Sequence, residues 1–381
     1  MNKILYIFGP LFFSVIFSLL VMAGIARQPK IKFSEVALGA QNTSRFAVRD
    51  GTLIHIQKRK DFPELISGVK SRNLGNTILW LGNSQLHAIN NAHVNDETAV
   101  AKVHDFLLGE FDTVATSYPN ANLQEHLVTL AYLHNKLNNI KVLIVPLVFD
   151  DLRETGIRDD IQPLLENPSV AEQLKTLQCC DHLVRGVFSD IDPHSSGVVK
   201  QEIDTRETLQ DKTEKFLDQI LERNSIIWAS REKARGLFFL QLYRLRNTVF
   251  AITPQTKRAV IKPRYKANIE AFKGILELAN RDVIQVVSYI APLRTDVKPP
   301  YDLAAYTSFK NEVRILCSQF PNVSFFDFER IVPAEYWGLK NTTSLNTAQE
   351  IDFMHFMEPG HQKLANAIVE VFRSMNLENV R

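Results

Sequence analysis

The feature that most restricts the fold of this chain is a set of short runs that are apolar on both faces. They are residues 77–82 (TILWLG), 113–118 (TVATSY), 141–149 (KVLIVPLVF), 282–291 (DVIQVVSYIA) and 322–328 (NVSFFDF). Strands of this kind belong to parallel sheets with helices on both faces, because a half-exposed antiparallel strand alternates apolar and polar residues. The pattern predicts a parallel sheet of five strands.

Amphipathic helical patterns lie between these runs. Residues 123–137 and 267–280 repeat Leu, Ile, Ala and Phe with the helical period, and each pattern leads into the next run. Strands that alternate with such helices form βαβ units. We therefore expect an α/β fold. A content of 45% hydrophobic and 23% charged residues is that of a globular protein and excludes intrinsic disorder.

The regular alternation is interrupted once, after the run that ends at Phe149. We expect residues 151–265 to form a mostly helical insertion in an α/β domain that spans residues 73–381. Residues 201–224 are highly charged. Residues 231–252 mix basic with apolar side chains, which is the composition of a helix at a membrane surface; the alternative is a core helix of the insertion.

The N-terminus carries an apolar segment, residues 4–26, with no charged side chain. As a helix it would be roughly 34 Å long, and the hydrocarbon core of a bilayer is about 30 Å thick. We therefore predict a transmembrane anchor within residues 1–28, a juxtamembrane linker over residues 29–72 and an extracytoplasmic domain. The alternative is a signal peptide cleaved near Ala26, which would give a secreted protein.

Charge and cysteine usage exclude several classes. A net charge of +2 gives no reason to expect a nucleic-acid partner. Cys179 and Cys180 are adjacent and Cys317 is distant, so the cysteines form neither a disulfide framework nor a metal-binding motif. The spacing of His87 and His93 does not place both on one helical face. We expect no metal and no cofactor.

A serine stands where ligands of parallel sheets bind, at the carboxyl end of a strand. Ser84 follows the first apolar run in the sequence GNSQLH. Its alternative role is a helix N-cap. A serine acts as a nucleophile only when a base lies close enough to take its proton. The predicted base is His355, with Asp352 three residues before it. Asp352 can bond one ring nitrogen and leave the other to accept the Ser84 proton; the alternative is local hydrogen bonding in a loop.

These motifs together resemble the SGNH, or GDSL-type, hydrolase superfamily. GNS at residues 82–84 stands in place of the family's first block, and DFMH at residues 352–355, followed by EPGH, in place of the last. The resemblance covers about residues 75–150 and 265–375. It implies a three-layer α/β/α sandwich with a flavodoxin-like sheet, and a Ser-His-Asp triad that forms an acyl-enzyme. An α/β-hydrolase would require Gly-x-Ser-x-Gly, and residue 86 is leucine.

The resemblance also implies an oxyanion hole made by the serine amide, a glycine amide and an asparagine side chain. The family's first-block aspartate is Asn83 here. No clear glycine of the second block follows the second run. The predicted donors are the side chain of Asn120 or Asn122, and the backbone amide of Ala121 in place of the glycine amide. Asp150 stands where the family's asparagine is expected, with Asp151 beside it. Since a carboxylate repels an oxyanion, we expect Asp150 to bind a substrate hydroxyl instead.

Arg153 and Arg294 follow the third and fourth runs, where they would clamp an acidic or polyhydroxylated substrate. The alternative for each is surface ion pairing.

The anchor and the triad together suggest a serine esterase or O-acyltransferase. Membrane-tethered proteins of the resembled family assist O-acylation of cell-wall or exported polysaccharides, as in alginate acetylation or teichoic-acid D-alanylation. The expected partners are an acylated carbohydrate or lipid-linked substrate and a multi-span membrane acyltransferase. The alternatives are a non-catalytic scaffold with this fold and a secreted lipase or esterase.

Overall fold

The computed structural model of the chain describes residues 41–137, 139–177, 226–341, 343–345 and 349–375, together with 16, 17, 20, 21 and 24. The chain divides into two compact units. The larger comprises Ala40–Asp192, Thr253–Asn341 and Ala348–Arg381, and the smaller comprises Met1–Gly39, Pro193–Ile252 and Thr342–Thr347.

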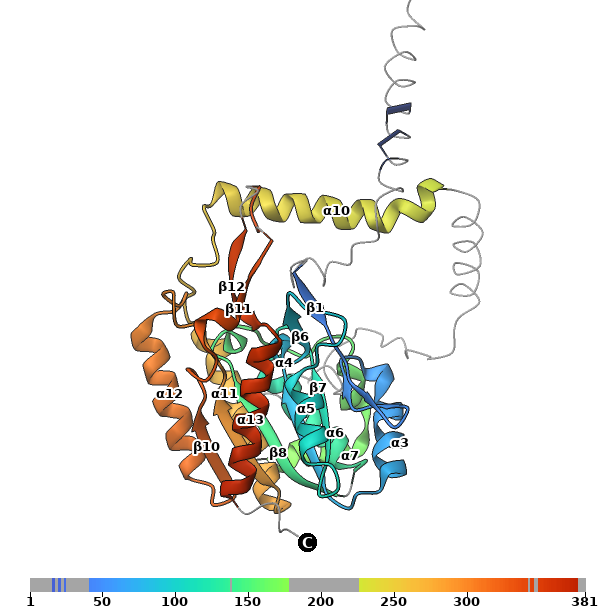
Figure 1. The fold of residues 1–381 in the computed structure, drawn as a ribbon, viewed down its shortest axis with the longest axis vertical. Coiled ribbons are helices and arrows are strands. Elements are labelled where there is room, and N and C mark those ends of the chain that lie inside the picture. The colour runs from blue at the N-terminus through green and yellow to red at the C-terminus, as the bar shows by residue number, and fades with distance from the viewer. Residues whose placement is uncertain are drawn as a thin grey trace, which may run out of the picture. The chain divides into compact units, whose positions relative to one another are not determined.

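The larger unit is built on a parallel sheet with the strand order β10-β9-β8-β5-β7-β4 (Figure 1). Every neighbouring pair in it runs parallel. The strands are β4 (His55–Ile56), β5 (Thr77–Gly82), β7 (Asp112–Ser117), β8 (Ile140–Leu147), β9 (Gln285–Ile290) and β10 (Val323–Asp327). The expected α/β class is confirmed, and each of the five apolar runs largely coincides with a strand.

The expected count of five strands is wrong, because the sheet has six strands among the described residues. The additional strand, β4, lies at the edge and pairs with β7 through only two residues, His55 and Ile56. A strand this short has no periodic pattern that the sequence would reveal.

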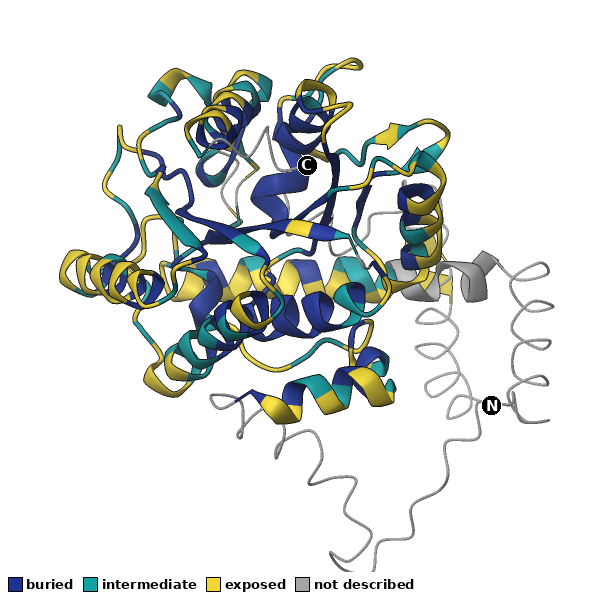
Figure 2. Ribbon diagram, turned by 90° about the horizontal axis from the view of Figure 1, so that it is seen from below, coloured by how far each residue is buried: buried dark blue, intermediate teal, exposed yellow. Residues whose placement is uncertain are grey.

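Helices cover both faces of the sheet. Alternate residues of β5 belong to different apolar clusters: Leu79 and Leu81 to the first, and Ile78 and Trp80 to the second. The first cluster packs under α3 (Phe62–Arg72), α6 (Leu123–His134), α7 (Pro168–Thr176), α11 (Lys262–Arg281) and α12 (Leu303–Ser318). The second packs under α5 (Ala99–Phe106) and α13 (Glu358–Ser374). Figure 2 shows that the buried sides of these helices face the sheet.

This two-sided burial explains why the strands have no polar face. Trp80, Leu79 and Leu81 are all fully buried. Each large apolar side chain moved from water into such a core contributes about 1.5 to 3 kcal/mol. The sheet thus holds the carboxyl end of β5 rigidly, and that end carries Ser84.

Much of the predicted linker, residues 29–72, belongs to the larger unit. Its described part forms β1 (Asn42–Ser44), β2 (Val48–Arg49), β3 (Thr52–Leu53), β4 and α3. Helix α3 buries Phe62, Leu65 and Val69, whose spacing places them on one face. These strands are only two or three residues long, so the sequence showed weak strand signals here, and α3 was not predicted.

The predicted insertion, residues 151–265, is divided between the units. The 3-10 helices η2 (Asp151–Arg153) and η3 (Gln162–Glu166) and helix α7 contribute Leu152, Leu164 and Leu174 to the core of the larger unit. In the smaller unit, α10 (Ile226–Val249) is a single helix of 24 residues. The charged stretch 201–224 lies outside the described residues.

The described part of the chain contains no helix that is both long and apolar enough to span a membrane. Most of the predicted anchor, residues 4–26, lies outside the described residues, although residues 16, 17, 20, 21 and 24 are helical.

Candidate active site

Ser84 is the first residue of a short helix, α4 (Ser84–His87), directly after β5. The preceding residue, Asn83, is extended, and its side-chain Oδ1 accepts a hydrogen bond of 2.9 Å from the amide of Gln85. Asn83 is therefore the N-cap, which satisfies one of the free amides at the helix start. Ser84 itself is not the cap, so its hydroxyl is available for another partner.

Asp352 and His355 lie on β12 (Glu350–Phe356), which pairs antiparallel with β11 (Trp337–Lys340). In this pairing Trp337 lies opposite Phe356, and Leu339 lies opposite Ile351. Residues 352–355 thus face Gly338 alone and bulge from the ladder. The bulge presents the aspartate and the histidine on the same side.

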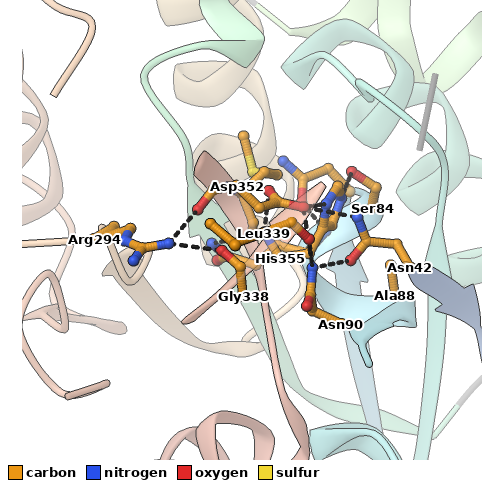
Figure 3. Close-up of polar contacts among 12 residues, drawn as sticks. Asn42, Ser84, Ala88, Asn90, Arg294, Gly338, Leu339, Asp352 and His355 are labelled. Atoms are coloured by element: carbon orange, nitrogen blue, oxygen red, sulfur yellow. Dashed lines mark hydrogen bonds and ion pairs between the residues drawn. The ribbon is translucent and has the colours of Figure 1, made fainter. Parts of the chain in front are cut away.

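The structure brings the three predicted catalytic residues together (Figure 3). His355 Nε2 lies 3.0 Å from Ser84 Oγ. His355 Nδ1 lies 3.1 Å from Asp352 Oδ2. Asp352 Oδ1 accepts the backbone amides of Met354 at 2.9 Å and His355 at 3.0 Å. Both carboxylate oxygens are thus held by donors.

The charge state of Asp352 sets the tautomer of His355. Burial raises the pKa of the Asp352 carboxyl, but His355, Lys340 and the amide of Met354 outweigh burial and hold that pKa well below its usual range. Asp352 is ionised at neutral pH and accepts hydrogen bonds only. His355 Nδ1 must carry the proton, and Nε2 is left to accept the proton of Ser84.

Two asparagines that the sequence did not indicate support the aspartate. Asn42 Nδ2 donates to Asp352 Oδ2 at 2.7 Å. Asn90 Nδ2 donates to Asn42 Oδ1 at 2.9 Å and to the carbonyl of Leu339 at 2.9 Å. Asn42 on β1 lies opposite Asn90 on β6 (Ala88–Asn90). This short antiparallel pair aligns the amide that orients Asp352.

Gly338 gives Asn90 the room for this arrangement. A Cβ atom at position 338 would overlap Asn90 Oδ1, far inside van der Waals contact. Since no real Cβ approaches a polar atom so closely, only glycine fits here without displacing Asn90.

Gln85 is a further residue whose role in the site the sequence did not indicate. Its Nε2 donates to the carbonyl of Pro292 at 3.0 Å and to that of Met354 at 3.0 Å. The residue after the serine is thereby tied to the bulge that carries His355 and to the loop after β9. Gln85 therefore positions the histidine relative to the serine.

Asp151, rather than Asp150, contacts the serine turn. Asn83 Nδ2 donates to Asp151 Oδ2 at 2.7 Å. Burial raises the pKa of the Asp151 carboxyl well above its usual range, and the hydrogen bond from Asn83 only partly opposes this. The environment favours a protonated, neutral acid at this position.

Asp150 and the two predicted arginines lie in ion pairs. Asp150 pairs with Arg258 and, at 3.4 Å, with Arg153. Arg294 is buried and binds both carboxylate oxygens of Asp296, at 2.8 and 3.0 Å. It also donates to the carbonyl of Gly338 at 2.7 Å. The Arg153 pair matches the alternative of surface ion pairing, whereas the Arg294 pair is buried. Asp150, which was expected to bind a substrate hydroxyl, is occupied by Arg258 and Arg153.

In the structure, the side chain of the predicted oxyanion donor Asn122 caps a helix, and the other predicted donor, Asn120, lies in an exposed turn. Asn122 caps α6: its Oδ1 accepts the amide of Glu125 at 3.0 Å, and its Nδ2 donates to the carbonyl of Gly156 at 2.9 Å. Asn120 is exposed in a turn with a left-handed φ of 51°. The capping box of Asn122 with Glu125 commits the Asn122 side chain to holding the start of α6.

Within the described ranges no group of three or more histidine, cysteine or acidic side chains is arranged to bind a metal ion.

His361, six residues after the triad histidine, is fully buried between the amide of Ala99 and the carbonyl of Ala88. Its role is to join α5, β6 and α13.

Comparison with protein-family models finds none that matches this chain, and comparison with curated proteins finds no match either. The functional interpretation therefore depends on the geometry of the site.

Proposed function

We propose that this chain is a serine esterase or O-acyltransferase that acts on ester-linked acyl groups. Ser84 is the nucleophile, His355 the general base and acid, and Asp352 the residue that orients the histidine. The observation that carries the proposal is the chain of hydrogen bonds from Ser84 Oγ through His355 to Asp352, at 3.0 and 3.1 Å. Such a chain, at the carboxyl end of a parallel strand, has the geometry of serine acyl transfer.

The reaction proceeds in two halves. His355 Nε2 takes the proton of Ser84 while Ser84 Oγ forms a bond to the acyl carbon. The carbonyl oxygen becomes the oxyanion of a tetrahedral intermediate, which then collapses and expels the alcohol. The alcohol oxygen receives the proton from His355, which leaves an acyl-enzyme. Water or a sugar hydroxyl then attacks the acyl carbon with His355 again as base, and Ser84 recovers its proton. Asp352 stabilises the imidazolium in both halves.

The raised pKa of Asp151 supports this chemistry. A carboxylate beside the serine turn would repel the oxyanion, whereas burial of Asp151 favours its protonated form. The other nearby acid, Asp150, is neutralised by Arg258 and Arg153. The amide of Ser84, at the start of α4, is the donor that we assign to the oxyanion.

The strand order supports an SGNH-like fold. Strands β7-β5-β8-β9-β10 are neighbours in that order, which is 2-1-3-4-5 by their sequence among these five strands. This is the order of flavodoxin-like sheets. Together with the predicted N-terminal anchor, it favours an extracytoplasmic protein that assists O-acylation of a cell-envelope or exported polysaccharide. Its partners would be a lipid-linked or acylated carbohydrate and a multi-span membrane acyltransferase.

The test is labelling with a fluorophosphonate probe, which reacts with activated serines. The wild-type chain and a Ser318→Ala control, which removes an exposed hydroxyl bonded only to its own helix at Ile315, should both be labelled. Ser84→Ala should not be labelled. Equal labelling of all three proteins would show that Ser84 is not the nucleophile.

The second candidate is a non-catalytic binding or scaffold protein. Ser84 and His355 expose only 5% and 7% of their surface, so an acyl substrate has a narrow approach to them. A Ser84→Ala protein that still supports O-acylation in cells would favour this candidate. A mature chain that begins at Arg27 would instead favour a secreted esterase over an anchored protein, and N-terminal sequencing shows whether the segment is cleaved.

A further inference from the structure

Helix α10, drawn in yellow in Figure 1, belongs to the smaller unit and carries an exposed apolar stripe. Phe238, Leu242, Leu245 and Val249 are 61%, 42%, 47% and 69% exposed. Residues spaced by three or four positions lie above one another on a helix, so these four side chains form one continuous stripe. A stripe of this size on a helix normally faces a core or an apolar environment.

The stripe lies on the side of α10 opposite to the helix's own contacts. The buried residues of this part of α10 are Leu240 and Asn247. Asn247 Nδ2 donates to the carbonyl of Thr343 at 2.9 Å. At about 100° per residue, these two positions point roughly 180° away from the stripe. The contacts of the described residues therefore leave the stripe uncovered.

The charge of α10 indicates what the stripe faces. Its sequence carries the basic residues Arg231, Lys233, Arg235, Arg244 and Arg246 and a single acidic residue, Glu232. The whole chain has a net charge of only +2, so positive charge is concentrated on this helix. A partner surface that is apolar at its centre and anionic at its edge complements this arrangement.

Two of these cations lie against aromatic rings of α10. The Arg235 guanidinium lies 5.7 Å from the ring centre of Phe239, and that of Arg246 lies 4.9 Å from the ring centre of Tyr243. Arginines beside aromatic rings are typical of helices at a lipid interface, where the rings lie among the headgroups and the guanidinium groups reach the phosphates.

We propose that α10 lies in the plane of an anionic membrane surface, with Phe238, Leu242, Leu245 and Val249 in the acyl boundary and Arg235 and Arg246 at the lipid phosphates. A second copy of the chain is disfavoured because two such helices would bring like charges together. The helix thus provides a membrane contact apart from the predicted anchor, and this inference does not depend on the proposed catalytic activity.

The test is photocrosslinking of the full chain in vesicles of phosphatidylethanolamine and phosphatidylglycerol. p-Benzoylphenylalanine replaces Leu242 in one protein. In the control it replaces Ile315, which is apolar and 62% exposed but lies on α12, outside the apolar stripe of α10. Lipid adducts should form at position 242 and not at 315. Replacing both Arg235 and Arg246 with Gln should lower the adduct yield at 242 at least about fivefold.

Other products would overturn the proposal. A covalent dimer would show that the stripe binds a second copy, and a crosslink to residues 4–26 would show that the chain's own N-terminal segment covers it. A crosslink to an added soluble protein would also overturn it. So would the absence of any adduct at position 242, provided that fluorophosphonate labelling or circular dichroism shows the protein to be folded.

Discussion

Replacing Asp352 with asparagine tests the tautomer on which the proposed mechanism depends. The carboxylate accepts five hydrogen bonds. Oδ1 takes the amides of Met354 and His355, and Oδ2 takes Asn42 Nδ2, His355 Nδ1 and, at 3.5 Å, Asn90 Nδ2. In Asp352→Asn the amide oxygen stays with the two backbone amides. The new NH₂ group then faces the three donors that had bonded Oδ2.

The imidazole can resolve this conflict only by moving its proton. If His355 becomes the Nε2–H tautomer, Nδ1 accepts a hydrogen from the new side-chain amide, and Nε2–H points at Ser84 Oγ. The histidine can then no longer take the serine proton. Loss of the base and of the negative charge should lower the rate 10³- to 10⁴-fold, about 4 to 5.5 kcal/mol in the barrier.

The assay is the rate constant for fluorophosphonate labelling of Ser84, which reports the nucleophile whether the natural acceptor is water or a sugar. The matched control is the double variant Asn42→Asp, Asp352→Asn. It restores an acceptor opposite position 352 and the lost negative charge, but it leaves His355 in the wrong tautomer. We expect the double variant to recover stability to denaturant and to remain slow.

Two results would refute this reasoning. A labelling rate for Asp352→Asn within tenfold of the wild type would show that the tautomer does not limit the reaction. Recovery of the rate together with stability in the double variant would show that Asp352 only supports the fold of the bulge.

Three further predictions concern the residues around the triad. Asn42→Leu removes the donor to Asp352 Oδ2, and since hydrogen bonds to charged groups contribute about 1.5 to 3 kcal/mol, labelling should slow about 10- to 100-fold. Unchanged labelling would exclude a positioning role. Gly338→Ala places a Cβ atom against Asn90 and should lower the free energy of unfolding by about 1 to 3 kcal/mol, measured by urea denaturation; an unchanged midpoint would mean that Asn90 moves freely. Asp151 has a raised pKa when folded, so the wild type loses stability as the pH rises above about 4, where the unfolded chain releases this proton. Asp151→Asn should therefore be more stable than the wild type at pH 7 and equal to it below about pH 4. A constant difference at both pH values would show that Asp151 is not protonated in the folded state.

The triad residues were recognisable because each stands in a local pattern. Ser84 follows an apolar run, and Asp352 lies three residues before His355. A spacing of three is enough to suggest a hydrogen bond between side chains of one segment. The bond from His355 to Ser84 joins residues 271 positions apart, and the sequence suggested it only through the combination of two motifs.

The residues that support the triad were not recognisable. Asn42 lies 310 positions from Asp352, and Asn90 lies 262 positions from it. Asparagine is common in loops, and neither residue stands in a periodic pattern. The roles of Asp150 and Asp151 also could not be separated by sequence, because adjacent residues differ only in which neighbours the fold brings to them.

The sequence by itself determined the strands of the α/β core, because a strand buried on both faces is a continuous apolar run that can be recognised without knowing its neighbours. It also determined the candidate nucleophile and its histidine. Only the tertiary structure decided the sixth strand, the pairing of Arg153 and Arg294 with carboxylates, and the network of Asn42, Asn90 and Gln85. The physical reason is that a hydrogen bond depends on distance and direction in space, and these arise when distant segments pack on one sheet.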